Sequence, residues 1–284
     1  MKIHADLASH IFEMSGDPTE KICLSSSVAK VLVERSPLHA WCKHRLLGGN
    51  RQDRTAATED GKIYETLIFG LQDEKIEVVE AADWRTNAAK DARASIERAG
   101  KIAILAPKYA EYANTAGMIK GGMERGGFVM NGAIQKKLQW EKDGVDCKAY
   151  LDHFVRTEGR IDDLKCVADA SPAAVANHMV KYGYDIQEAA YTEAAETLYP
   201  DLIGRVKFTF WFAEKELPYA VQPYTTTGMM KELGRRKWDF AKRVWAGCLS
   251  GNVWPGYGEG ILSVEAKPWH LQAQEDREGG VGHE

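Results

Sequence analysis

CKAYLDHFVRTEGRIDDLK, residues 147–165, is the stretch that decides the fold. Strand-forming residues lie on both sides of the polar segment 156–160, in which Gly159 supplies a turn signal. The pattern predicts two short strands joined by a tight turn centred near Thr157 and Glu158. Side chains on such strands alternate between the two faces of a sheet, so the hairpin sorts its polar residues by face.

Three side chains with useful chemistry meet in this predicted hairpin. Asp163 and Lys165 are two residues apart, so on a strand they point to the same face. The turn places Asp152 opposite Asp163, and a slip of one residue would place it nearer Lys165. Paired carboxylates hold a hard divalent cation, and a neighbouring lysine orients water or stabilises negative charge. The alternative interpretation is a surface hairpin with an ordinary Asp–Lys ion pair.

The order of these residues resembles the signature of PD-(D/E)XK nucleases: Asp152, then ten residues, then Asp163-Leu164-Lys165. Three downstream motifs resemble the RecE-like exonuclease branch of phages and prophages, which is related to lambda exonuclease: ADASP at 168–172, YGY at 182–184, and Gln187-x-x-x-Tyr191. The resemblance covers most of the chain. It implies an α/β fold with a restriction-endonuclease-like core, in which a central mixed β-sheet is flanked by helices and helical insertions, with the hairpin at the sheet's edge.

The same resemblance implies a metal-dependent deoxyribonuclease that resects double-stranded DNA from its 5′ ends. Asp152, Asp163 and the carbonyl of Leu164 are implied as ligands of Mg²⁺, with Mn²⁺ as an alternative metal. Lys165 is implied to position or deprotonate the attacking water. Gln187 and Tyr191, four residues apart on one face of a predicted helix, are implied to hold the substrate strand.

Two alternative functions stay open at this point. One is a structure-specific or endonucleolytic member of the same superfamily. The other belongs to a different class, a non-catalytic DNA-binding scaffold that keeps the fold. Related enzymes form closed rings around DNA and hand a 3′ single strand to an annealing protein. A homo-oligomeric ring and a single-strand annealing partner are therefore expected.

Residues 61–70, GKIYETLIFG, resemble a family helix that carries a Gly-x-x-x-His motif. The histidine of that motif reaches the metal, and in this chain Glu65 stands at its position. Glutamate is a good ligand for a hard cation, so Glu65 is predicted as a third metal ligand. A surface glutamate is the alternative interpretation.

Composition limits the class of protein. The chain has 284 residues, 44% hydrophobic and 27% charged, which is typical of a soluble globular enzyme. A net charge of −4 argues against a DNA-coating protein, although a channel can be locally basic. The five cysteines are scattered without paired spacing, so a reducing compartment and no iron–sulfur cluster are expected. No apolar run of membrane-spanning length, no signal peptide and no Walker loop occur, so a cytoplasmic protein without a bound nucleotide is expected. The resemblance to RecE-like exonucleases implies a phage or prophage protein.

The remaining segments give the predicted organisation. A single nuclease domain is expected at 1–272, with a helical N-terminal part at 20–126 and a catalytic core at 127–270. Residues 48–60 are predicted as a loop, residues 72–126 as accessory helices broken at Gly121-Gly122, and residues 273–284 as a disordered tail. Candidate DNA contacts are Ser27, which could instead be a helix cap, and Arg235 and Arg236 in the most basic predicted helix.

Overall fold

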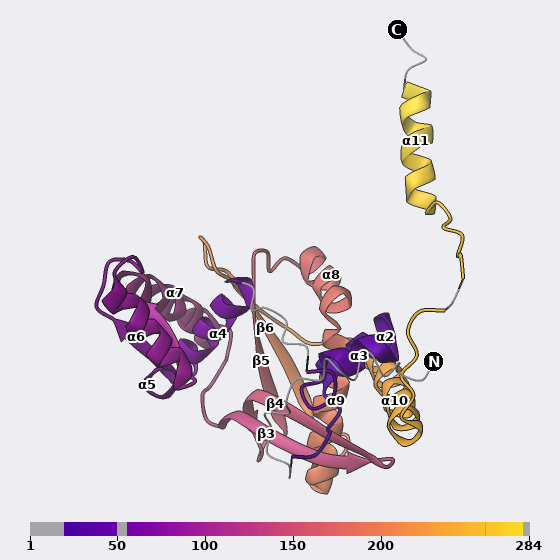
Figure 1. Cartoon of the computed structure of the whole chain (residues 1–284), viewed down its shortest axis with the longest axis horizontal. Helices are drawn as coiled ribbons and strands as arrows, with labels where there is room; N and C mark the ends of the chain where they lie inside the picture. Colours follow the sequence, from indigo (N-terminus) through magenta and orange to yellow (C-terminus); the bar gives the residue numbers. More distant parts are fainter. Residues whose placement is uncertain (1–19, 50–55, 259, 281–284) are drawn as a thin grey trace.

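A five-stranded mixed sheet lies at the centre of the protein (Figure 1). The computed structural model describes residues 20–49, 56–258 and 260–280. The strands follow one another in the sheet in chain order: β3 (Ala133–Lys142), β4 (Val145–Val155), β5 (Arg160–Val167), β6 (Lys207–Glu214) and β7 (Val221–Tyr224). All neighbouring strands are antiparallel except β5 and β6, which are parallel. The predicted mixed sheet is confirmed.

The predicted hairpin is β4 and β5. Val155 pairs with Arg160 and His153 with Asp162, so the turn is centred at the predicted place. Gly159 has a φ of +62°, a left-handed conformation that glycine adopts without a steric penalty. The expected position at the sheet's edge is wrong, because β6 pairs with the far side of β5 and makes β5 the central strand.

One face of the sheet is covered by helices of the core. They are α2 (Ser26–Glu34), α3 (Pro37–Lys43), α8 (Pro172–Tyr182), α9 (Tyr184–Leu198) and α10 (Gly228–Gly251). A short 3₁₀ turn, η1 (Pro200–Leu202), follows α9. Phe208, Phe210 and Phe212 alternate along β6 toward this face, where they join Trp238 and Trp245 in the main core. Ser171 caps α8 and Gly183 ends it in the left-handed conformation.

The other face of β5 and β6 packs against a second lobe, drawn at the left of Figure 1. This lobe contains α4 (Ala56–Ile68), α5 (Gln72–Lys75), β1 (Ile76–Val79), α6 (Asn87–Arg98), β2 (Ile102–Leu105) and α7 (Ala106–Arg125). The predicted accessory helices of 72–126 are present, but the prediction missed β1 and β2, which form a two-stranded parallel sheet. Each strand is only four residues long and adjoins charged helical sequence, so its alternation is hidden.

Three other boundaries differ from the prediction. Helix α4 begins at Ala56, inside the expected loop. Helix α7 continues through Gly122, where a Cβ atom would lie 2.7 Å from Val221 Cγ2, so glycine is required by close packing and does not break the helix. Helix α11 (Pro268–Gly280) includes most of the expected disordered tail, with hydrogen bonds between side chains four residues apart.

Helix α11 stands away from the rest of the molecule (Figure 1), and Trp269 and Leu271 on it are exposed.

Within the described part of the chain, no helix combines the length and apolar character needed to span a bilayer.

Candidate active site

Three carboxylates from three elements face one another beside the central strand. Asp163 on β5 is only 1% exposed, and Asp152 on β4 and Glu65 on α4 are half-buried. Asp152 Oδ2 accepts a hydrogen bond of 2.9 Å from the backbone N–H of Leu164, which fixes it against β5. The charge of Asp163 acts on both other carboxylates. The structure thus places Asp152, Asp163 and Glu65 near enough for their charges to act on one another.

The three acidic side chains of the cluster have raised pKa values. Burial raises the pKa of Asp152 well above its usual value, and the charges of Asp163 and Glu65 raise it further. Burial also raises the pKa of Glu65 and of Asp163, and in Asp163 the Lys165 ammonium and the Gln187 amide partly oppose the shift. Such a group of buried acids is stabilised by a cation, and perturbed carboxyl pKa values of this kind gather at functional sites.

Lys165 completes the cluster. Its ammonium forms an ion pair with Asp163, its side chain is 15% exposed, and it lies 4.7 Å from the centre of the Tyr184 ring. Burial alone would lower the pKa of Lys165, but the charges of Asp163 and Asp152 outweigh it and raise the pKa above its ordinary value. The side chain is therefore an ammonium at neutral pH.

Helix α9 supplies the residues behind Asp163. Gln187 Nε2 donates a hydrogen bond of 2.6 Å to Asp163 Oδ1, so Gln187 orients the carboxylate. Tyr191 is 8% exposed and packs against Phe208 in the main core. Because Tyr191 is buried behind Gln187, we expect it to support the Gln187 side chain. This role fits its burial better than the predicted contact with a substrate strand. Burial raises the pKa of Tyr184, whose ring lies under Lys165, to about 12.

Gln135 is a site residue that no sequence pattern indicates. It has a φ of +45° inside β3, and the ladder with β4 is interrupted between the pairs Ile134–His153 and Lys136–Leu151. Its amide nitrogen donates to Glu65 and its amide oxygen accepts from Lys75 of α5. A left-handed glutamine costs about 1–3 kcal/mol, and such strain is found at functional sites. Gln135 therefore holds the Glu65 carboxylate of the lobe from strand β3 of the sheet.

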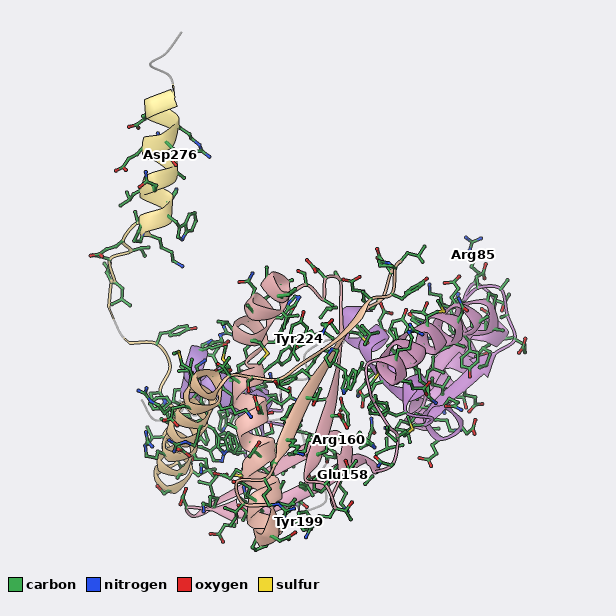
Figure 2. All side chains as sticks on the ribbon, turned by 180° about the vertical axis from the view of Figure 1, so that it is seen from behind. Arg85, Glu158, Arg160, Tyr199, Tyr224 and Asp276 are labelled. Atoms are coloured by element: carbon green, nitrogen blue, oxygen red, sulfur yellow. The ribbon has the colours of Figure 1, made fainter. Side chains whose placement is uncertain are left out.

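Asp162, the neighbour of Asp163, points to the other face and forms a separate network. Its carboxylate accepts hydrogen bonds from Arg160 Nε (3.0 Å), His153 Nδ1 (2.9 Å) and Trp211 Nε1 (3.0 Å). Gly132 N–H donates to His153 Nε2, so the imidazole proton lies on Nδ1. Figure 2 shows Arg160 beside Glu158, with which it also pairs at 2.7 Å. This network holds the hairpin and contains no part of the acid cluster.

The candidate DNA contacts lie apart from these residues. Ser27 is exposed in the first turn of α2, and Ser25 is the N-cap residue, so the predicted cap at Ser27 is wrong. Arg235 pairs with Glu232 and Asp239 of its own helix, and Arg236 is exposed on α10. Their contact with DNA stays a prediction.

The oxygen atoms of the acid cluster are of the kind that bind a hard divalent cation. Asp163 Oδ2 is buried and pairs with the Lys165 ammonium, and the donor set is made of carboxylates and a backbone carbonyl. Across 20–49, 56–258 and 260–280, no three His, Cys, Asp or Glu side chains are gathered closely enough to enclose a metal as they stand. Lys165 occupies the space against Asp163, so side chains would move when a cation enters.

This arrangement defines a nuclease-type PD-(D/E)XK fold. The central strand carries an acid and a lysine on one face, the paired strand carries a second acid, and a flanking helix adds a carboxylate. The chain belongs to the family described as a PDDEXK-like domain of unknown function (DUF3799), whose model matches residues 57–267. The family predicted from the hairpin is thereby confirmed.

Solved structures resemble this chain in fold. A "Putative exonuclease" from Eubacterium rectale aligns with a TM-score of 0.56 at 17% identity, over 89% of this chain and 93% of that one. A phage related exonuclease from Haemophilus somnus 129PT aligns with a TM-score of 0.37 at 13% identity, over 82% of this chain and 98% of that one, and this weaker similarity carries no argument. No curated protein sequence matches the chain.

Proposed function

We propose that this protein is a metal-dependent deoxyribonuclease that hydrolyses double-stranded DNA from its 5′ ends. The observation that carries the proposal is the meeting of Asp152, Asp163 and Lys165 on one face of the sheet, with Glu65 beside them. Membership of a PDDEXK-like family supports phosphodiester hydrolysis. The choice of DNA ends rests on the resemblance to RecE-like exonucleases.

Each side chain of the cluster would have a separate role in such a reaction. Asp152, Asp163, Glu65 and the Leu164 carbonyl would hold Mg²⁺ or Mn²⁺, which when bound polarises a phosphoryl oxygen and lowers the pKa of a bound water. Lys165, whose ammonium pairs with Asp163, would stabilise negative charge and orient the attacking water. Gln187 keeps Asp163 in position through its 2.6 Å hydrogen bond.

A digestion experiment tests the proposal. Linear duplex DNA labelled at either the 5′ or the 3′ end is incubated with the protein with and without Mg²⁺, beside a closed circular duplex. Early release of the 5′ label, gradual shortening of the 3′-labelled strand and an intact circle are expected. Cleavage of the circle would indicate an endonuclease. Hydrolysis no greater than that of an Asp163→Asn variant would indicate a non-catalytic scaffold.

The proposed assembly rests on the same resemblance. A closed homo-oligomeric ring would keep the enzyme on one duplex, and a single-strand annealing protein of the same phage or prophage would receive the 3′ strand in the bacterial cytoplasm. Light scattering coupled to gel filtration measures the mass of the assembly. A monomer at working concentrations would contradict the ring.

Metal binding should stabilise the protein in a pH-dependent way. Because the folded-state pKa values of Asp152 and Glu65 are raised, the metal-free folded protein binds more protons than the unfolded chain above about pH 4, and its stability falls as pH rises. Lys165 is protonated in both states over this range, so it adds no slope. A saturating cation replaces the protons, so Mg²⁺ should raise Tm by about 5 °C at about pH 8 and very little at about pH 5.

Thermal denaturation with and without Mg²⁺ at the two pH values measures this effect. Asp163→Asn serves as the control, because it removes a carboxylate from the centre of the cluster and should abolish the gain. An equal gain at both pH values, or the same gain in Asp163→Asn, would contradict binding at these acids.

Gln135→Gly should weaken metal binding without weakening the fold. Glycine adopts the positive φ of this position without strain, while the hydrogen bond that orients Glu65 is lost. Loss of a partner that orients a metal ligand lowers metal affinity or activity by about 10- to 100-fold. Isothermal titration with Mn²⁺ measures the affinity. Gln139→Ala, an exposed position on the same strand, should bind as the natural protein does.

A further inference from the structure

The outer face of β3 and β4 leads along the sheet to the acid cluster. On the inner face of these strands, Leu138 and Leu151 pack in the main core. Side chains alternate along a strand, so their neighbours Lys137 and Tyr150 point to the outer face, where the two are paired directly across the strands. Asp152 follows Tyr150 by two residues on β4. An extended polymer that follows β4 into the acid cluster therefore passes Tyr150.

Tyr150 presents an aromatic ring to solvent on this face. The residue is 53% exposed, and among β3 to β7, whose residues the structure describes in full, it is the large apolar side chain that is exposed. Rings of this kind serve as platforms on which the bases of a single strand stack. Neighbouring base pairs cover both faces of a base inside a duplex, so a base that stacks on Tyr150 would be unpaired.

Cations surround Tyr150. The hydrogen bond from Arg45 lowers the pKa of Glu20, and the charges of Lys148 and Lys137 lower it further, so one carboxylate lies among three cations. Arg45 is also close enough to Tyr150 for the two groups to interact electrostatically. Three cations and one carboxylate leave a net charge of +2, which attracts a phosphate backbone.

Lys137 is the cation best placed to contact a phosphate. Arg45 and Lys148 share the Glu20 carboxylate, and the Lys148 side chain is only 19% exposed. Lys137 is exposed and lies directly opposite Tyr150. A strand that stacks a base on the ring of Tyr150 would therefore have its backbone beside the Lys137 ammonium.

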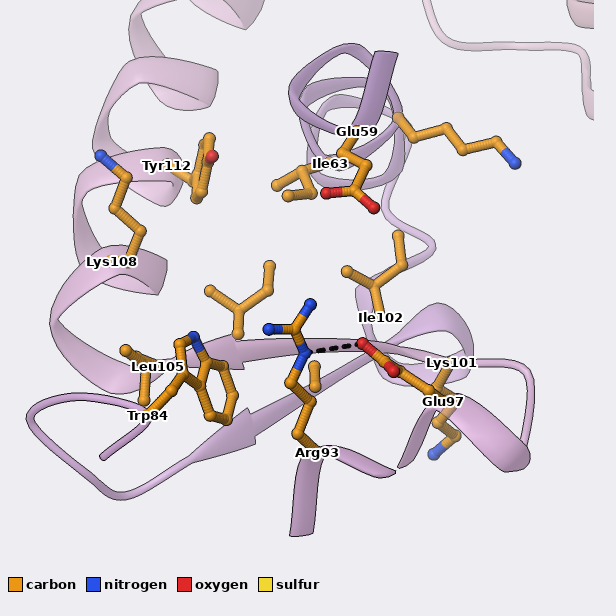
Figure 3. A pocket seen from close by; sticks show the side chains of 13 residues that line it. Glu59, Ile63, Trp84, Arg93, Glu97, Lys101, Ile102, Leu105, Lys108 and Tyr112 are labelled. Atoms are coloured by element: carbon orange, nitrogen blue, oxygen red, sulfur yellow. Dashed lines mark hydrogen bonds and ion pairs between the residues drawn. The ribbon is translucent and has the colours of Figure 1, made fainter. Parts of the chain in front are cut away.

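Two other surfaces of the described chain lack this excess of positive charge. Toward the turn between β3 and β4, the outer face carries Glu141 and the pair of Asp146 with Lys21 at 2.9 Å, so its charge is negative there. A cavity of about 310 Å³ lies in the lobe of α4 to α7 (Figure 3). Four cations and two glutamates line that cavity, and two further glutamates pair with its lysines, so its charges balance. The exposed ring and the positive charge coincide beside Asp152.

We propose that Tyr150 stacks on an unpaired base of the DNA strand that enters the acid cluster, and that Lys137 contacts the phosphate beside that base. The inference rests on the proposed function, which supplies DNA as the ligand. Tyr150 and Asp152 are about 7 Å apart along β4, close to one nucleotide step of an extended strand. With the scissile phosphate at the acid cluster, the ring therefore lies beside the adjacent base. Tyr150 and Lys137 bind the substrate and take no part in breaking the phosphodiester bond.

Fluorescence anisotropy in EDTA tests the inference apart from the proposed hydrolysis, because binding is then measured without metal-dependent cleavage. The probes are two fluorescein-labelled dodecamers, one of thymidine and one of abasic tetrahydrofuran residues with the same phosphates. The natural protein should bind the thymidine strand about 10-fold more tightly, because only that strand can stack. Tyr150→Ala should reduce this preference to about 2-fold or less, and Tyr150→Phe, which keeps the ring, should retain it.

Each substitution has a matched control. Tyr257 is 64% exposed and lies against His39, away from the sheet, so Tyr257→Ala should keep the preference for thymidine. Lys137→Gln should weaken the binding of both strands alike and reduce the slope of log K against log salt by about 0.7, the effect of one lost phosphate contact. Lys136→Gln, at the neighbouring position that points to the opposite face, should leave the slope unchanged.

The inference is overturned if the natural protein binds the two strands equally, if Tyr150→Ala keeps the natural preference, or if Lys136→Gln and Lys137→Gln change the salt dependence to the same extent. A protein that shows the expected binding but no hydrolysis in Mg²⁺ would contradict the proposed function and leave the stacking site in place.

Discussion

Replacing Lys165 with methionine should lower DNA hydrolysis by about 1000-fold or more, while the protein remains folded. The ammonium pairs with the buried Asp163 and is itself largely buried, and in such a setting a positive charge stabilises developing negative charge more than in water. Methionine keeps the length and apolar stem of the side chain and removes only the charge. Initial rates on 5′-labelled linear duplex, with saturating Mg²⁺, measure the effect.

Lys148→Met is the matched control for this substitution. Lys148 lies on β4 and is 19% exposed, close to the exposure of Lys165, but its partner is Glu20 at 3.9 Å, outside the acid cluster. Activity near that of the natural protein is expected. Similar losses in the two variants would mean that any buried charge in this sheet is needed for folding, and that Lys165 has no special part in the reaction.

Asp162→Ala should lower the free energy of unfolding by about 3–5 kcal/mol. The substitution leaves Arg160 Nε, His153 Nδ1 and Trp211 Nε1 without their common acceptor, in a position that is 2% exposed. Urea denaturation followed by tryptophan fluorescence measures the change, which should appear as a lower midpoint with an unchanged slope.

Asp163→Asn, one residue along the strand, provides the contrast. It should abolish hydrolysis with a much smaller loss of stability, because Asp163 is buried among carboxylates and its own pKa is raised. Adjacent aspartates on opposite faces would then separate folding from activity. A stable but inactive Asp162→Ala, or an Asp163→Asn that is strongly destabilised, would contradict this division.

The hairpin and the shared face of Asp163 and Lys165 could be predicted because they depend on local signals. Alternation and a turn fix which side chains point together, whatever the rest of the chain does. The central place of β5 could not be predicted in the same way. It depends on parallel pairing with β6, which is reached only after two helices, and nothing within the hairpin specifies that partner.

The roles of Asp162 and Gln135 depend on contacts that are still more distant in sequence. Alternation along β5 puts Asp162 and Asp163 on opposite faces, but only the placement of α4 and α9 decides which face holds the acid cluster. Gln135 meets Glu65 across the junction of lobe and sheet, and its left-handed backbone has no sequence signal, since glutamine is not a residue that favours it.

The parallel pairing of β5 with β6 also bears on how the protein folds. It joins residue 160 to residue 207, so closure of a long loop must precede the completed sheet. The β4–β5 hairpin can form from neighbours in sequence, whereas Gln187 reaches Asp163 only when the crossover has docked. A refolding chain should therefore acquire secondary structure early and catalytic competence in a later, slower phase.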